Sequence, residues 1–341
     1  INTGRFLWVS PSVVLSSSSL DKKSQLISKP SSSFSSTRLR EMTVSFSLSP
    51  FPLAPFRNQP LASPAKWRAR ATLKKMDRAK QLVAEFPHLL QPHKDVLTRL
   101  VSTVDSRLAS HLLPSDDSVP ADVEFYQSKD GSSVGCLSVN RGLDSSPIDM
   151  MLTSCLRLQL PNGPEMKIAT LQSFLKASTD APHLVFELAQ YGPAYFVLSL
   201  DLISRKDLVL HPEYLKSVYE DSPLEVCRKG FFEQVPEAQS YNYMSSSLYL
   251  RSLLSPTGIL AAIKCDEGSS ERIEEIMRDH IGPVADEVIG IWIDYVLSGR
   301  NVAEIERGEL ERRDHKLKIN AYEMDLGPKF PMVFGEDVAD R

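Results

Sequence analysis

The sequence predicts an α+β fold built around an antiparallel sheet. Two stretches with helical spacing come first, at residues 76–86 and 93–113, and a longer one lies at about 270–297. Between them are short runs with strand character, separated by turn signals such as "KDG", "LPNGP" and "YGP". Strands that are neighbours in sequence can pair through short turns. This order therefore favours an antiparallel sheet over a doubly wound parallel one.

The helical stretches are recognised by their apolar spacing. The stretch 93–113 places six apolar residues on one face, which we expect to be buried: Val96, Leu97, Leu100, Val101, Val104 and Leu108. Near the C-terminus, "EIERGELERRDHKLK" (304–318) is predicted to be a solvated charged helix. The following "YEMDLGPKFP" (322–331) is predicted to be extended, because Gly327 and two prolines block regular structure.

The predicted strands are the runs 134–139, 149–160, 166–171, 183–190, 194–203 and 246–264. In "AYFVLSLDLI" (194–203), one side of the alternation is apolar and the other carries Ser199 and Asp201. The Gly192-Pro193 turn makes this run the antiparallel hairpin partner of 183–190.

Two carboxylates stand out from their neighbours. Glu187 interrupts the apolar run "HLVFEL", and a buried charge costs several kcal/mol to desolvate. Asp325 lies in the segment "YEMDLGPKFP". From the residues alone, Glu187 could instead face outward or be paired, and Asp325 could stabilise a turn. Asp149, Asp201 and Asp207 are interpreted as sheet-end or salt-bridged residues.

Several function classes lack their signatures. Neither GxGxxG nor GxxxxGK[ST] occurs, and no GxSxG or HExxH is present. The four cysteines are far apart in sequence, so they offer no metal or iron–sulfur spacing and are interpreted as reduced core residues: Cys136, Cys155, Cys227 and Cys265. No bound metal or cofactor is expected. The apolar stretches are too short for a transmembrane segment.

The first 70 residues differ in composition from the rest. They hold ten Lys/Arg against two Asp/Glu, whereas residues 71–341 hold 29 against 41. A Ser-rich, Arg-containing, acid-poor leader is typical of an organelle transit peptide, with a disordered tail as the alternative. We interpret Met42 as the initiator and residues 1–41 as upstream sequence; a longer leader is the alternative. Residues 71–341 are then a single domain, and their acidic charge argues against nucleic acid as the partner.

The body resembles the red chlorophyll catabolite reductase family of plant chlorophyll breakdown in senescence. The passages that carry the resemblance include "HLLPSDDSVPADV", "APHLVFEL", "SLYLRSLLSPTG", "RDHIGPVADEV" and "ELERRDHKLKINAYEMDLGPKFPMVFGEDV". They occur in family order from about residue 76 to the end. The family continues beyond "FGEDVADR" into a short helix, so the chain is expected to be truncated there.

The resemblance implies a fold similar to that of ferredoxin-dependent bilin reductases, an α/β/α sandwich with a central antiparallel sheet between helices. The implied reaction is reduction of one methine bridge of red chlorophyll catabolite, an open-chain tetrapyrrole, to primary fluorescent chlorophyll catabolite. Electrons come from reduced ferredoxin, and no flavin, nicotinamide or metal is bound. The protein's own task is then to hold the pigment and to supply protons.

The resemblance also implies site residues. The family's two essential carboxylates map onto Glu187 and Asp325 as catalytic proton donors or relays. A hydrophobic position that steers product stereochemistry falls on Leu254, where Phe or Val is expected, which leaves the product epimer open. Val185 and Ser255 are assigned as further substrate-binding residues.

The implied setting is the chloroplast stroma, with mitochondria as a second location, and a homodimer. Candidate partners are ferredoxin, the oxygenase of pheophorbide a and other enzymes of chlorophyll breakdown. Because ferredoxin is acidic, docking needs a basic patch, for which the candidates are Arg205-Lys206, Lys216, Arg228-Lys229 and Arg251. The alternatives are a bilin reductase acting on biliverdin and a non-catalytic tetrapyrrole carrier.

Overall fold

The computed structural model describes residues 75–113, 121–159, 165–240, 248–266, 268–299, 302–321 and 327–340. All of them belong to one compact unit. The predicted leader, residues 1–70, lies outside the described residues. In the described ranges, no helix has the length and apolar character to span a membrane.

The strands are β1 (Phe125–Gln127), β2 (Val134–Arg141), β3 (Ile148–Gln159), β4 (Glu165–Leu175), β5 (His183–Tyr191), β6 (Tyr195–Ile203), β7 (Ala238–Ser240) and β8 (Ile259–Lys264). The helices are α1 (Lys75–Glu85), α2 (Gln91–Leu108), α3 (Ala121–Glu124), α4 (Pro212–Leu215), α5 (Leu224–Gln234), α6 (Leu248–Ser252), α7 (Ser270–Glu275), α8 (Gly282–Leu297), α9 (Glu304–Ala321), α10 (Gly327–Phe334) and α11 (Glu336–Ala339). Shorter helical turns are η2 (Ala109–His111), η3 (Lys216–Glu220) and η4 (Ile276–Ile281).

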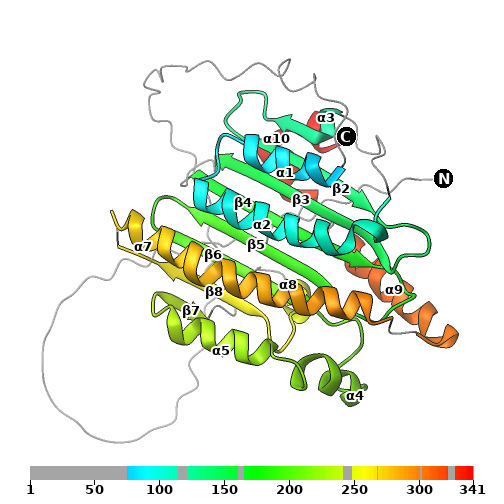
Figure 1. Ribbon diagram of the computed structural model, residues 1–341. Helices are drawn as coiled ribbons and strands as arrows, with labels where there is room; N and C mark the ends of the chain where they lie inside the picture. The colour runs from blue at the N-terminus through cyan, green and yellow to red at the C-terminus, as the bar shows by residue number, and fades with distance from the viewer. Residues whose placement is uncertain are drawn as a thin grey trace, which may run out of the picture. The chain divides into compact units, whose positions relative to one another are not determined.

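The described strands form one eight-stranded sheet in the order β1-β2-β3-β4-β5-β6-β8-β7 (Figure 1). Every pairing is antiparallel, which confirms the predicted sheet type. The predicted hairpin between β5 and β6 is also confirmed: Tyr191 lies opposite Tyr195, and Gly192 has a φ of 63°. Glycine adopts this left-handed conformation without a steric penalty, so the three-residue turn can close.

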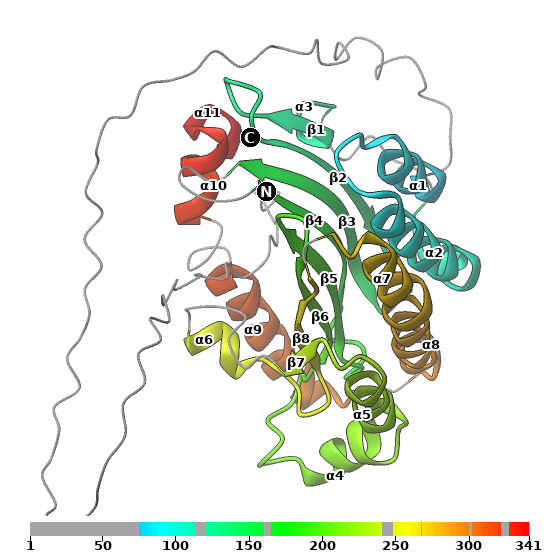
Figure 2. The same cartoon turned by 90° about the vertical axis from the view of Figure 1, so that its left-hand side faces the viewer.

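Helices cover both faces of the sheet, as the predicted sandwich requires. Figure 2 shows α1, α2, α7 and α8 on one side and α9, α10 and α11 on the other. We call the first side the core face and the second the Glu187 face.

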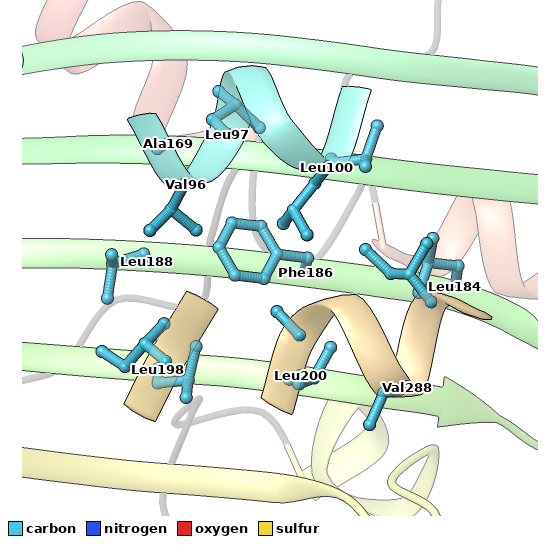
Figure 3. Packing of buried hydrophobic residues seen from close by; sticks show 14 of the residues in the cluster. Val96, Leu97, Leu100, Ala169, Leu184, Phe186, Leu188, Leu198, Leu200 and Val288 are labelled. Carbon is cyan, nitrogen blue, oxygen red and sulfur yellow. The ribbon is translucent and has the colours of Figure 1, made fainter. Parts of the chain in front are cut away.

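The core face carries the main hydrophobic cluster. Phe186 of β5 is fully buried beneath α2 and α8, where Leu100 and Val288 lie around it (Figure 3). All six apolar residues predicted for one face of α2 are buried. Burying a side chain of this size contributes about 1.5–3 kcal/mol. This cluster therefore fixes the core face against its helices.

The predicted strand over 246–264 is wrong in its first half. Residues 248–252 form α6, and the strand begins only at Ile259. Pro256 has no amide hydrogen for a sheet ladder. The backbone N–H of Ser255 donates instead to the side chain of Asp201, at 3.0 Å.

The predicted continuous helix at 270–297 is interrupted by the π-helical turn η4. This turn ends at Ile281, two residues before Pro283, which lacks the amide hydrogen that an α-helix would direct to the carbonyl of Asp279. The helix widens where that hydrogen bond cannot form.

The predicted solvated charged helix at 304–318 forms as α9, but one of its faces is buried. Leu310, Asp314 and Leu317 of α9 are 3%, 6% and 1% exposed. Their spacing of four and three residues places them on one side of the helix. That side packs on the Glu187 face, where Leu317 contacts a cluster with Val185.

The prediction that 322–331 is extended is wrong from Gly327 onward, where α10 begins. The first four amide groups of a helix have no partner within the helix, so Pro328 costs no hydrogen bond there. Pro331 removes only one backbone hydrogen bond of the helix. The prediction assumed the cost of prolines in the middle of a long helix, and that cost is lower here because both prolines lie near the start of α10.

A buried ion network holds α9 against the sheet. Arg205 donates to both carboxylate oxygens of Asp314, and the Nε2 atom of His183 lies 3.0 Å from Asp314 Oδ1. His183 Nδ1 accepts the amide hydrogen of Leu175 at 3.1 Å, so Nε2 carries the proton and donates. Burial would raise the pKa of Asp314, but the His183 hydrogen bond and the Arg205 charge together lower it to about 2.

We expect Asp314→Ala to lower the free energy of unfolding by about 3–5 kcal/mol, because it leaves the buried Arg205 charge without its partner. Chemical denaturation measures this loss. The matched control is Asp294→Ala, since Asp294 is 68% exposed and pairs with Arg107 at 2.6 Å. An exposed pair contributes about 0–1 kcal/mol. Equal losses in the two variants would contradict the role given to Asp314.

Candidate functional site

Glu187 lies in the middle of β5, on the face opposite Phe186. Successive residues of a strand alternate between faces, so His183, Val185, Glu187 and Ala189 share the Glu187 face. Thr170 of β4 and Ser199 of β6 lie directly opposite Glu187 in the ladder. The Glu187 side chain is 1% exposed, so the edge-strand alternative with an outward-facing carboxylate is wrong.

Polar residues surround Glu187 on this face. The strand register places them in two adjacent rows across β3 to β6. We call them the polar patch: Ser154, Thr170, Glu187 and Ser199 in the first row, and Gln172 and Asp201 in the second. Each is no more than 3% exposed. The patch is therefore a buried polar surface in the centre of the sheet.

Apolar clusters border the polar patch on both sides. On one side, Phe330 and Phe334 of α10 pack against Tyr126, with ring centroids 5.5 and 5.1 Å from it. Tyr126 reaches across Gly135, where a Cβ would lie 2.5 Å from the tyrosine ring. On the other side, Leu317 of α9 packs in a cluster with Val185. The two C-terminal helices thus cover opposite borders of the patch.

Several polar atoms of the patch are unsatisfied. Ser154 Oγ, Ser199 Oγ and both side-chain polar atoms of Gln172 are buried without a hydrogen-bond partner among the described residues. Each such atom costs about 1–3 kcal/mol when it is buried, and native proteins contain few of them. Their concentration around one carboxyl group points to a ligand that brings donors and acceptors.

Asp201 is a second buried carboxyl group on this face. Ser255 donates to it through both its backbone N–H and its hydroxyl group. Gly258 leaves room for the Asp201 carboxyl group, because a Cβ at position 258 would lie 2.9 Å from Asp201 Cγ. Burial raises the pKa of Asp201 to about 6, against the lowering effect of the Ser255 hydrogen bonds. Asp201 connects the loop that follows α6 to the sheet.

The structure brings most of the predicted site residues together. Val185 shares the Glu187 face, and Ser255 binds Asp201, which lies directly opposite Val185. Leu254 precedes Ser255 and is half-buried in the same loop. Asp325 lies outside the described residues.

The interpretation of Asp201 as a sheet-end or salt-bridged residue is wrong. The alternation of "AYFVLSLDLI" contained the signal, since it placed Ser199 and Asp201 on the side away from the leucines. Asp149 does form an ion pair, with Lys318 at 2.5 Å, and Asp207 accepts the amide hydrogen of Val209 at 2.9 Å.

The basic residues considered for docking are largely engaged within the chain. Arg205 is 1% exposed in the Asp314 network, so it offers no surface charge, and that part of the prediction is wrong. The Nζ atom of Lys206 lies 3.3 Å from a carboxylate oxygen of Asp180 and 3.3 Å from one of Glu306. Lys216 pairs with Asp221. Arg228 and Lys229 both pair with Glu225.

Within the described ranges, no three His, Cys, Asp or Glu side chains are grouped so that they could hold a metal ion. All four cysteines are free and buried, as the interpretation of core residues requires. Cys136 and Cys155 lie opposite each other in β2 and β3.

Comparison with known proteins identifies the family. Residues 92–341 match the family model for red chlorophyll catabolite reductase (RCC reductase). The chain is 38% identical to the chloroplastic red chlorophyll catabolite reductase of Arabidopsis thaliana over 307 residues, which cover 88% of this chain and 94% of that protein. The chain belongs to the red chlorophyll catabolite reductase family.

Other comparisons agree with this membership. The chain is 41% identical to chloroplastic red chlorophyll catabolite reductase 1 of Oryza sativa subsp. japonica, over 73% of this chain and 75% of that protein. The chloroplastic relatives support a chloroplast location for this member of the family. Its fold is similar to the crystal structure of tomato phytochromobilin synthase in complex with biliverdin. The TM-score is 0.53 at 16% identity, covering 71% of this chain and 78% of that one.

The raised pKa of Asp201 predicts a pH dependence of stability in this reductase-family chain. The fold favours the protonated carboxyl group, so the contribution of Asp201 is fully present below about pH 4 and is lost as the pH rises through about 6. Asp201→Asn is neutral at every pH. We expect the difference in unfolding free energy, Asp201→Asn minus the unsubstituted chain, to rise by about 1–3 kcal/mol between pH 4 and pH 8.

Urea denaturation at the two pH values measures this difference. The control is Asp221→Asn, because the Asp221 side chain is 55% exposed. A pH-independent effect of Asp201→Asn would show that Asp201 titrates no differently in the folded and unfolded chain.

Proposed function

We propose that this chain reduces red chlorophyll catabolite to primary fluorescent chlorophyll catabolite with electrons from ferredoxin. Membership of the reductase family supports the substrate. The observation that carries the proposal is the burial of the Glu187 carboxyl group, 1% exposed, within a polar patch that has unsatisfied donors and acceptors. Apolar borders around a few convergent polar groups suit an extended pigment.

The chemistry required of the protein is proton supply. Reducing one methine bridge adds two electrons and two protons across its carbon–carbon double bond. Ferredoxin supplies the electrons one at a time to the bound pigment, and no flavin, nicotinamide or metal takes part. Burial favours the protonated form of a carboxyl group, which is the form that donates. Glu187 therefore donates a proton to the pigment carbon that lies above the polar patch.

Asp325 supplies the second proton. It belongs to the five residues, 322–326, that connect α9 to α10. These two helices pack on opposite borders of the polar patch, through Leu317 and Phe334 respectively. The packing of both flanking helices at the patch supports this proposed role for Asp325.

The pocket walls come from the sheet and from the loop that follows α6. Val185 offers an apolar contact beside Glu187, and Leu254 steers the product epimer. Ser255 holds the loop by donating to Asp201, so it positions Leu254 relative to the sheet. The half-buried state of Leu254 is consistent with a side chain that a bound pigment would contact.

The cellular setting belongs to the same proposal. The chain acts in the chloroplast stroma, with mitochondria as a second site, as a homodimer. It receives its substrate from the oxygenase that opens pheophorbide a. Other enzymes of chlorophyll breakdown are further partners. Ferredoxin docks by charge complementarity on a local basic patch.

The direct test is an anaerobic assay of the full chain with red chlorophyll catabolite and reduced ferredoxin. We expect a blue-fluorescent product that requires ferredoxin, and no product from biliverdin. Turnover of biliverdin instead would identify a bilin reductase. Binding of either pigment without turnover would favour the carrier function.

We expect Glu187→Gln and Asp325→Asn each to lower turnover by at least about a hundredfold, the usual scale for loss of a general acid, and to keep the pigment dissociation constant within about tenfold. Steady-state kinetics and absorbance titration measure the two quantities. Asp294→Asn, on α8 at the opposite face of the sheet, is the matched control and should leave both unchanged. Normal turnover in both acid variants would rule out the assigned roles.

A further inference from the structure

Gln172 of β4 has a buried primary amide that lacks hydrogen bonds. Its side chain is 0% exposed, and neither its oxygen nor its nitrogen has a partner among the described residues. It lies on the Glu187 face, directly opposite Val185 and two residues from Thr170, the ladder partner of Glu187.

The position of Gln172 makes a structural role a poor explanation. An unpaired amide costs free energy that an apolar side chain of similar size would avoid. Its ladder neighbours in the same row, Leu152 and Val185, are apolar and offer no hydrogen bond. The nearby unsatisfied hydroxyl groups belong to Ser154 and Ser199 in the adjacent row. A ligand that occupies this face would satisfy the hydrogen bonds that the fold leaves open.

The chemistry of the amide indicates what that ligand offers. A primary amide presents one N–H donor beside one C=O acceptor, and its complement is a group with an acceptor beside a donor. A lactam is such a group, because its ring fixes N–H and C=O on the same side. An open-chain tetrapyrrole made by oxygenative ring opening carries a lactam on a terminal ring.

We infer that Gln172 binds the terminal lactam of the linear tetrapyrrole by exchanging two hydrogen bonds with it. This inference rests on the proposed function and adds to it a residue that sets the position of the substrate. Glu187 and Gln172 are diagonal neighbours, with Cα atoms about 7–8 Å apart in such a geometry. Holding one end ring at Gln172 fixes which carbon of the pigment faces Glu187.

The first test is Gln172→Leu in the full chain. We expect an unchanged or higher melting temperature without pigment, because the substitution removes an unsatisfied buried amide. We expect the dissociation constant for red chlorophyll catabolite to rise by about ten- to a hundredfold, the scale for two lost hydrogen bonds. The matched control is Gln190→Leu. Gln190 is 4% exposed, has an unpartnered Oε1 and lies on the core face of β5, so pigment binding should not change.

A modified substrate tests the lactam itself. O-methylation of the terminal lactam gives a lactim ether, which has lost the N–H donor and carries a methyl group on the oxygen. The unsubstituted chain should bind red chlorophyll catabolite at least about tenfold more tightly than this lactim ether. Gln172→Leu should bind the two pigments equally, which a variant that merely weakened the fold would not do.

Gln172→Glu provides a pH-dependent readout. A protonated carboxyl group offers a donor beside an acceptor and can pair with a lactam, whereas a carboxylate offers only acceptors. Binding by Gln172→Glu should therefore weaken as the pH rises, more steeply than binding by the unsubstituted chain. If the pigment affinities of Gln172→Glu and of the unsubstituted chain depend on pH in the same way, the inference is wrong.

The outcomes separate the inference from the function on which it rests. If the unsubstituted chain reduces red chlorophyll catabolite and Gln172→Leu keeps its affinity and its discrimination against the lactim ether, the inference is wrong and the reductase stands. If no reduction occurs but Gln172 still controls that discrimination, the lactam site stands and the reductase proposal fails.

Discussion

The structure depends on β5 being buried on both of its faces. Strand alternation directs Phe186 to the helices of the core face and Glu187 to the opposite face, and each side chain is no more than 1% exposed. A sheet with one face in water could satisfy polar residues by hydration. Here C-terminal helices cover the second face, so polar groups on it must be satisfied by protein or ligand. The same covering that excludes water makes the patch selective for its occupant.

The cover over the Glu187 face is held from its ends rather than through the polar patch. On one border, the ion network of Asp314 and the contact of Leu317 fix α9. On the other, the rings of Tyr126, Phe330 and Phe334 fix α10. The groups proposed to carry the chemistry therefore need not support the cover. This division allows unsatisfied polar atoms to persist in a folded chain.

Features set by local pattern could be predicted from the sequence, whereas features set by distant partners could not. The alternation in β5 and β6 and the spacing in α2 were sufficient for the sheet type and the hairpin. The interpretation of Asp201 was wrong because its partner, Ser255, is 54 residues away in sequence. The buried face of α9 was not predicted because its Asp314 pairs with an arginine 109 residues away. Glu187 stood out because its apolar neighbours are adjacent in sequence. Gln172 did not, since a glutamine in a strand is unremarkable until its surroundings are known.

The order of the strands has a consequence for when the site is completed during folding. Strands β1 to β6 each pair with their neighbour in sequence, so this part of the sheet can form hairpin by hairpin through short loop closures. Strand β8 joins β6 only after the chain has made an excursion through residues 204–258, which is the longest closure in the sheet. Ser255 lies at the end of that excursion. Asp201 therefore gains its donors, and the pocket its loop, only when the slowest pairing has formed.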